Sequence, residues 1–277
     1  MTNTIIPEQV ASIVFAAGKG SRMKGYDGNK TLLPLLASPA APYEGARPLL
    51  MEVLDNLPPG PKAIVVHHRA DDVRRATAAL SCSYWFQPET NGTGGALLAA
   101  RPFLESVDQE RVIITMGDVP LIRPETYGQL LDSLGKNHLT VLAFDPRDPA
   151  QYGKLEVEGP RVLRIVEWKY WSREQDPLRR ARLRLCNAGV YAARRGPLLE
   201  CLEELEKTPH TVEKERDGRW VTIQEYFLTD LVEIMNRRGY TVGYCLAEEE
   251  EVLGVDTPES LRRAQALYAQ VRVSSLG

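Results

Sequence analysis

Small residues, hydroxyls and cations alternate in the stretch Ile13–Met23, which reads IVFAAGKGSRM. Its apolar half is typical of a buried strand, and Gly18 and Gly20 permit backbone angles that other residues resist. Backbone N–H groups exposed at such glycines can cradle an anion. Neighbouring side chains would add hydrogen-bond donors, namely Lys19, Ser21 and Arg22. The stretch matches neither a Walker A loop nor the Gly-x-Gly-x-x-Gly turn, whose third glycine is replaced by Met23. Its residues alone fit either a phosphate site or a plain strand-to-helix turn.

Two further places carry groups that suit ligand chemistry. Asp118 closely follows the apolar run Arg111–Met116, and α/β proteins bind ligands at the carboxyl ends of their parallel strands. The segment Gln87–Ala96, QPETNGTGGA, places glycines before an expected helix. Such a helix N-terminus suits an anion or the edge of a base. A structural reading of Asp118, as a turn residue after a strand, stays open at this point.

The composition limits the class of protein. With 277 residues, 43% of them apolar and 26% charged, the chain is long enough for one large α/β domain. A net charge of −3 argues against a nucleic-acid partner. No apolar run is long enough to cross a membrane, and Met1–Gln9 does not resemble a signal peptide. The four cysteines form no Cys-x-x-Cys pair and the histidines lack zinc spacing, so we expect reduced thiols in a cytoplasmic protein.

The order of the expected elements predicts the fold class. Strands and helices alternate as far as the expected strand Leu139–Phe144, which is typical of a parallel sheet with helices on both faces. After residue 150 the pattern changes. The alternating segments 152–158 and 161–168 predict a hairpin. The last element is a terminal helix, with Thr257 as its N-cap and Pro258 at its first position.

Four other segments have weaker patterns. We expect surface loops at 37–47 and 208–220, because proline, glycine and polar residues are frequent there. Residues 222–237 predict a helix. The charged stretch 169–184 fits a solvated loop or helix face, a lid or a subunit contact, and it contains Arg179, Arg180, Arg182 and Arg184.

The opening stretch resembles the signature of the sugar nucleotidyltransferases, Leu-Ala-Ala-Gly-x-Gly-Thr-Arg-Met followed by Pro-Lys. Phe15, Ser21 and Asn29 replace Leu, Thr and Pro. Further stretches, in the same order and from about residue 12 to 268, resemble the uridylyltransferase domain that makes UDP-N-acetylglucosamine. They are Gln87 with Asn91-Gly92-Thr93-Gly94, Gly117-Asp118-Val119-Pro120-Leu121, Tyr152-Gly153-Lys154, Glu167, Asn187-Ala188-Gly189, Glu225-Tyr226-Phe227-Leu228-Thr229-Asp230 and Gly254-Val255-Asp256.

This resemblance implies a Rossmann-like, mostly parallel mixed sheet with helices on both faces and a β-hairpin region that binds the sugar. It implies one domain over 1–277, with a nucleotide-binding half at 1–150 and a sugar-binding half at 151–277. The expected reaction joins a sugar 1-phosphate to a nucleoside triphosphate, with UTP and N-acetylglucosamine 1-phosphate favoured, and releases pyrophosphate. No general base is needed, because the attacking phosphate is already ionised.

The resemblance also implies roles for individual residues. Arg22 and Lys30 would act in catalysis, and Asp118 and Asp256 would bind Mg²⁺. The nucleotide would be bound by Ala16, Ala17, Gly18, Gly20, Ser21, Gln87, Gly92 and Thr93. The sugar would be bound by Gly153, Glu167, Asn187 and Phe227. Asp256 also fits a helix cap, and Glu167 and Asn187 also fit purely structural roles.

The sequence departs from the family pattern at several positions. Thr90 stands where a second glutamine would face the base, Trp168 replaces a histidine beside the sugar, and Asp256 replaces Asn. The hexapeptide repeats of the family's acetyltransferase domain are not found in this sequence. Two alternatives therefore stay open: a transferase for another sugar phosphate or for CTP, dTTP or GTP, and a non-catalytic sensor of nucleotide sugars.

Overall fold

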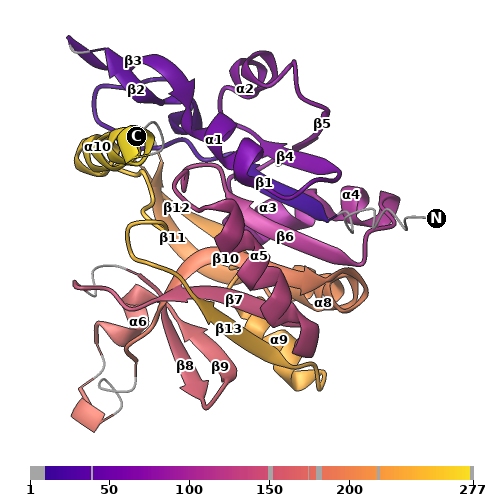
Figure 1. Cartoon of the computed structure of the whole chain (residues 1–277). Helices are drawn as coiled ribbons and strands as arrows, with labels where there is room; N and C mark the ends of the chain where they lie inside the picture. The colour runs from indigo at the N-terminus through magenta and orange to yellow at the C-terminus, as the bar shows by residue number, and fades with distance from the viewer. Residues whose placement is uncertain are drawn as a thin grey trace.

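A nine-stranded sheet forms the centre of the protein, with the strand order β5-β4-β1-β6-β10-β7-β13-β9-β8. The computed structural model describes residues 10–38, 40–148, 152–173, 175–178, 183–216 and 219–274. Helices lie on both sides of the sheet, and two small hairpins extend from it (Figure 1). The expected mixed α/β fold with helices on both faces is confirmed. The N-terminal strand enters from one side of the sheet, so the carboxyl ends of the parallel strands gather at the opposite side (Figure 1).

The first half of the chain builds one side of the sheet from parallel strands. They are β1 (Ala11–Ala16), β4 (Lys62–Val66), β5 (Cys82–Phe86) and β6 (Arg111–Met116). Every residue of β1 is buried, because successive side chains point to opposite faces and each face is covered. Ile13 and Phe15 pack into the core on one face, and Val14 and Ala16 pack into the core on the other.

The rest of the sheet mixes strands from both halves of the sequence. Its strands are β7 (Leu139–Phe144), β8 (Lys154–Glu158), β9 (Arg161–Val166), β10 (Cys186–Arg194) and β13 (Val242–Leu246). β10 lies between β6 and β7 and is antiparallel to both. β8 and β9 form the expected antiparallel hairpin. Because β10 inserts between two strands of the first half, residues 1–150 and 151–277 share one sheet.

The helices divide between the two faces according to their apolar side chains. One face packs against α3 (Thr93–Ala99), α4 (Arg101–Ser106), α8 (Arg195–Lys207) and α9 (Asp230–Arg237). The other packs against α1 (Leu49–Asn56), α2 (Ala70–Ala76) and α5 (Pro124–Ser133). Short helical turns occur at Lys30–Leu32, Leu134–Lys136 and Trp168–Trp171 (α6). The terminal helix α10 (Pro258–Ser274) buries Leu261 and Ala264 in a third, smaller core. No helix among the described residues is long and apolar enough to cross a membrane.

Two segments expected to be loops are antiparallel hairpins instead. Of the described residues in 37–47, all but Ala40 lie in β2 (Pro34–Ser38) or β3 (Ala41–Pro48). A side chain at Gly45 would clash with the carbonyl oxygen of Leu36 at 2.0 Å, so this glycine allows a close approach of the two strands rather than marking a loop. Residues 208–220 contain β11 (His210–Arg216) and the start of β12 (Arg219–Glu225).

The prediction of a helix over 222–237 is also partly wrong. Residues 219–225 belong to β12, and only Asp230–Arg237 is helical. The β-branched residues Thr222 and Ile223 favour a strand, but the polar residues around them hid this signal. Arg179, Arg180 and Arg182 lie outside the described residues. Arg184 forms an ion pair with Asp145 at 2.5 Å.

Candidate functional site

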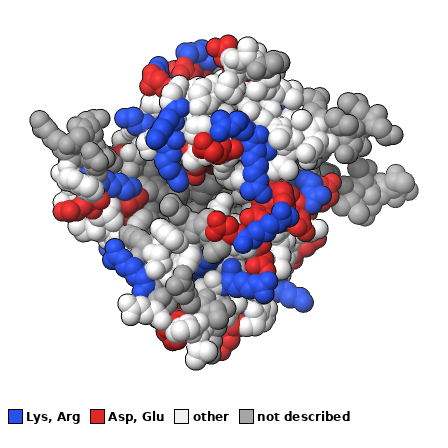
Figure 2. Space-filling view, turned by 90° about the vertical axis from the view of Figure 1, so that its left-hand side faces the viewer, with Lys and Arg blue, Asp and Glu red and all other residues white. Residues whose placement is uncertain are grey.

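A cavity of about 580 Å³ opens at the carboxyl ends of the parallel strands. Phe15 at the end of β1, Met116 at the end of β6 and Gln87 after β5 all line it. Figure 2 faces this side of the molecule and shows basic and acidic side chains around a hollow. The charged residues that line the cavity are three cations, Arg22, Lys30 and Lys214, and three carboxylates, Asp118, Glu225 and Asp256.

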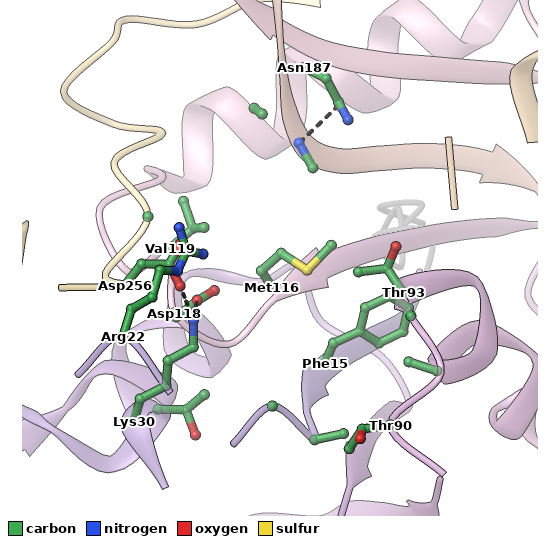
Figure 3. Close-up of a pocket in the computed structure, with 18 of the residues that line it drawn as sticks. Phe15, Arg22, Lys30, Thr90, Thr93, Met116, Asp118, Val119, Asn187 and Asp256 are labelled. Carbon is green, nitrogen blue, oxygen red and sulfur yellow. Dashed lines mark hydrogen bonds and ion pairs between the residues drawn. The ribbon is translucent and has the colours of Figure 1, made fainter. Parts of the chain in front are cut away.

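Lys30 is the centre of a charged cluster at one end of this cavity (Figure 3). Its ammonium forms ion pairs with both Asp118 and Asp256. Arg22 Nη2 lies 2.9 Å from Asp256 Oδ2. The Lys30 side chain is only 13% exposed, whereas that of Arg22 is 63% exposed. The cluster thus joins a buried cation, an exposed cation at the rim and two carboxylates from distant parts of the sequence.

The opposite charges of this cluster shift the pKa values of Lys30 and Asp256. Burial lowers the pKa of Lys30, but the charges of Asp118 and Asp256 outweigh burial and raise that pKa from 10.5 to about 12. Burial raises the pKa of Asp256, but the charges of Lys30 and Arg22 outweigh it and hold that pKa below its ordinary value. At neutral pH Lys30 and Asp256 are therefore both charged.

Asn29 fixes the position of Lys30. This residue is 1% exposed. Its Nδ2 donates to the carbonyl oxygens of Ala16 (2.8 Å) and His68 (2.9 Å), and its Oδ1 accepts from Thr31 N (3.0 Å) and Thr31 Oγ1 (2.8 Å). The amide thus ties the turn that carries Lys30 to the ends of β1 and β4. A side chain at Gly20 would meet Lys30 Cβ at 3.1 Å, so the glycine loop also packs closely on the lysine stem.

Asp118 and Asp256 are brought together by backbone contacts. Asp118 follows β6, and its carbonyl oxygen accepts a hydrogen bond from Val255 N at 2.9 Å. Asp256 lies just before α10, and its backbone N donates to Ser260 Oγ at 2.9 Å. Gly117 N donates to Phe15 O at 2.9 Å. These bonds explain how a residue near the end of the sequence reaches the carboxyl edge of β6.

The chemistry of this donor set fits a magnesium ion. Mg²⁺ is typically bound by one or two carboxylates together with substrate phosphates rather than by a full cage of protein ligands. Asp118 and Asp256 provide two carboxylates that converge on one point. Within the described ranges there is no group of three or more His, Cys, Asp or Glu residues that could hold a metal alone. The cluster therefore suits a metal that arrives with a phosphate ligand.

The other end of the cavity is formed by the loop before α3. Gly92 has a φ of +96°, and a side chain there would meet Tyr226 O at 2.3 Å and Glu225 Cγ at 2.8 Å. Gly94 N donates to Tyr226 O, and Tyr226 N donates to Asn91 O. Gln87 is 3% exposed, and its Nε2 donates to Asn91 Oδ1 at 3.0 Å and Gly92 O at 3.1 Å. Both N–H donors of this side-chain amide are thus used inside the loop.

The residues predicted to bind the sugar lie in two neighbouring places. Asn187 lines the central cavity, and its backbone N donates to Gly153 O at 2.9 Å. Glu167 and Phe227 line a separate cavity of about 390 Å³. Glu167 Oε1 accepts from Thr229 Oγ1 at 2.8 Å. A side chain at Gly153 would lie 3.7 Å from Glu167 Oε2, so Gly153 lies between the two sets.

The structure gathers most of the predicted site residues around the central cavity. Those that line it are Ala17, Gly18, Arg22, Lys30, Gln87, Gly92, Thr93, Asp118, Asn187 and Asp256. Those that do not line it are Ala16, Gly20, Ser21, Gly153, Glu167 and Phe227. Ala16 is buried at the end of β1, where its carbonyl oxygen accepts from Asn29.

Lys214, which no sequence motif indicates, pairs with Glu225, and its Nζ lies 2.6 Å from Glu225 Oε1. Both residues line the cavity. Lys214 lies in the segment predicted to be a loop and Glu225 in the segment predicted to be a helix, whereas both belong to the hairpin β11–β12. The β-branched residues Thr211, Val212 and Val221 were the available signal. Charged residues between them masked the alternation.

Comparison with known proteins identifies the family. Residues 12–210 match the model of the MobA-like NTP transferase domain. The chain belongs to this family. The bifunctional protein GlmU of Cereibacter sphaeroides is 36% identical over 264 residues, which cover 94% of this chain and 52% of GlmU. The chain spans about half the length of the curated relatives it matches. The comparisons therefore agree with the resemblance of its motifs to sugar nucleotidyltransferases.

Solved structures support the same fold. The uridine diphosphate N-acetylglucosamine pyrophosphorylase of Trypanosoma brucei has a TM-score of 0.69 at 14% identity, over 98% of this chain and 68% of that one. A CMP:2-keto-3-deoxy-manno-octonic acid synthetase complexed with CTP has a TM-score of 0.61 at 18% identity, over 95% and 99%. At these identities the likeness shows the fold alone.

Proposed function

We propose that this MobA-like NTP transferase joins a sugar 1-phosphate to a nucleoside triphosphate and releases pyrophosphate, in a Mg²⁺-dependent reaction. UTP and N-acetylglucosamine 1-phosphate are the favoured substrates. The observation that carries the proposal is the buried Lys30, held between Asp118 and Asp256 beside a glycine loop. A protein that only sensed nucleotide sugars would have less need for this whole charged cluster.

The reaction needs charge neutralisation more than proton transfer. An oxygen of the sugar phosphate attacks the α-phosphorus while the bond to the leaving pyrophosphate breaks, so negative charge builds on that leaving group. Lys30 holds a fixed positive charge beside this centre, because its pKa of about 12 keeps it protonated. Arg22 pairs with Asp256 at the exposed rim and would contact the phosphates there. Fixed cations stabilise developing charge without reorganising during the reaction.

The backbone and carboxylates supply the remaining contacts for phosphate. The N–H groups of the loop Gly18–Ser21 would cradle the β- and γ-phosphates. Asp118 and Asp256 would hold Mg²⁺, which when bound supplies further neutralisation and orients the phosphates. Gln87, Gly92 and Thr93 would bind the nucleoside, since they line the opposite end of the cavity.

The sugar would lie between Asn187 and Glu167, with Gly153 beneath it. Asn187 lines the central cavity, and Glu167 lines the separate cavity of about 390 Å³. A carboxylate that accepts from two sugar hydroxyls discriminates epimers, because a misplaced hydroxyl leaves it poorly paired. The favoured substrates are those of the uridylyltransferase domain that the chain resembles. The 36% identity to GlmU supports this choice.

A panel of nucleotides and sugar phosphates tests the proposal through pyrophosphate release. UTP, dTTP, CTP and GTP would each be paired with the 1-phosphates of N-acetylglucosamine, glucose and galactose, with Mg²⁺ present. We expect the highest kcat/KM for UTP with N-acetylglucosamine 1-phosphate. Turnover with no pair would refute a transferase function, and a better pair would refute the favoured substrates while retaining the reaction.

A further inference from the structure

The hairpin β11–β12 places two charged side chains at the nucleoside end of the central cavity. Lys214 and Glu225 both line this cavity, together with Thr90, Gly92 and Thr93 of the loop before α3. The lysine side chain is 43% exposed and the glutamate side chain 11% exposed. A side chain built at Gly92 would touch Glu225 Cγ at 2.8 Å. The pair therefore lies against the loop that we propose binds the nucleoside, away from the cluster around Lys30.

The strand register explains how Lys214 reaches this position. His210 pairs with Glu225, and Lys214 pairs with Val221 near the hairpin tip. Residues 210, 212 and 214 share a face, because side chains alternate along a strand. The lysine must therefore run along this face toward the base of the hairpin, where its Nζ lies 2.6 Å from Glu225 Oε1. The glutamate thus holds the ammonium at the wall of the cavity.

Residues 87–93 include no Lys or Arg, so the loop offers no charged donor to a base. Gln87 uses both side-chain N–H donors inside the loop, on Asn91 and Gly92. The hydroxyl oxygen of Thr93 accepts from Leu228 N at 3.3 Å, and its O–H can donate only as a neutral group. In contrast, a lysine ammonium has three N–H donors, of which the contact with Glu225 uses one. The hairpin therefore supplies the charged donor and the charged acceptor at this end of the cavity.

We propose that Lys214, held by Glu225, determines which pyrimidine the enzyme accepts and favours uracil or thymine over cytosine. A uracil or thymine edge presents a carbonyl oxygen beside an N–H group, which matches an ammonium beside a carboxylate. Cytosine presents an amino group where uracil has that carbonyl. An ammonium can only donate, so it would face another donor. This inference deepens the proposed function, because it assigns the nucleotide preference of the same site to a specific residue.

The test compares affinities for UTP and CTP in wild type, Lys214→Met and Lys207→Met. Lys207 is a matched control, since it lies exposed at the end of α8 and removal of its charge leaves the cavity intact. Titration calorimetry without sugar phosphate measures binding independently of turnover. We expect Lys214→Met to weaken UTP binding about tenfold and CTP binding about twofold or less. Lys207→Met should match wild type.

Three results would overturn the inference: a wild-type preference for CTP, unchanged UTP binding in Lys214→Met, or equal losses for both nucleotides. Equal losses would make Lys214 a general anion-binding cation without base selectivity. Steady-state kcat/KM values for both nucleotides separate the inference about Lys214 from the proposed transferase function. Selective loss of UTP binding without turnover in wild type would support the inference and refute the proposed function. Turnover in wild type, with the UTP-to-CTP ratio of kcat/KM unchanged in Lys214→Met, would support the proposed function and refute the inference about Lys214.

Discussion

Replacement of Asn29 by alanine should weaken both the fold and the reaction. The side-chain amide makes four hydrogen bonds, to Ala16 O, His68 O, Thr31 N and Thr31 Oγ1, at 2.8–3.0 Å. A hydrogen bond contributes about 1 kcal/mol net, and more when its removal leaves a buried partner unsatisfied. Asn29→Ala should therefore lower the free energy of unfolding by about 3 to 4 kcal/mol. Lys30 is the next residue, so the ammonium should lose its fixed position and kcat should fall about tenfold or more.

Urea denaturation and steady-state kinetics at a temperature where the variant stays folded would measure both effects. Asn236→Ala is a matched control. Its side chain also makes four hydrogen bonds, to Val162, Leu163, Val232 and Arg161, but none of these residues lines the central cavity. We expect the control to lose stability and keep wild-type kcat. If Asn29→Ala loses less than about 1 kcal/mol, or loses stability with kcat unchanged, the reasoning that Asn29 positions Lys30 is wrong.

Four further predictions follow from the cavity and the core. Asp118→Asn should stay folded by circular dichroism and lose about a hundredfold in kcat. Asp256→Asn should lose less, since the resembling enzymes carry Asn there. Equal rates of Asp118→Asn and wild type in limiting Mg²⁺ would contradict a metal role for Asp118. Arg22→Ala should lower kcat more than it weakens UTP binding measured by calorimetry, because charge on the leaving group grows in the transition state; equal losses would make it a plain binding residue. Glu167→Ala should raise the KM for the sugar phosphate and reduce discrimination between glucose and galactose configurations, with little change in the KM for UTP; the opposite pattern would remove Glu167 from the sugar site. Burial raises the pKa of the Cys201 thiol from 9.0 to about 11, so the folded state retains a proton that the unfolded chain loses. Stability should therefore be unaffected by this group below pH 9 and decline as the pH rises toward 11, which urea midpoints of wild type and Cys201→Ala would reveal as a smaller decline in the variant.

Local sequence patterns predicted the elements whose burial is strongest. The runs Ala11–Ala16 and Arg111–Met116 are mostly apolar, because both faces of those strands are covered. Two hairpins escaped prediction for the opposite reason. Many described residues of β2–β3 and β11–β12 are exposed, so proline, glycine and charged residues are tolerated there and resemble loop signals.

The arrangement of the sheet depends on contacts that local patterns do not record. β10 pairs with β6 and β7, which lie far earlier in the sequence. The approach of Asp256 to Lys30 joins residues 226 positions apart, and only the resemblance to a family placed them in one site. Lys214 has no counterpart among the quoted motifs, so neither patterns nor resemblance pointed to it. The role of each site residue remains a prediction.

The fate of labelled phosphorus tests the central claim most directly, because it reports which bond the enzyme breaks. UTP labelled with ³²P at the α or the γ position would be incubated with N-acetylglucosamine 1-phosphate and Mg²⁺. If Lys30, Asp118 and Asp256 serve nucleotidyl transfer, the α label should appear in the sugar nucleotide and the γ label in pyrophosphate. Asp118→Asn should form neither product at a comparable rate. Release of the γ label as orthophosphate, or no transfer of the α label to any sugar phosphate of the panel, would contradict the proposed reaction.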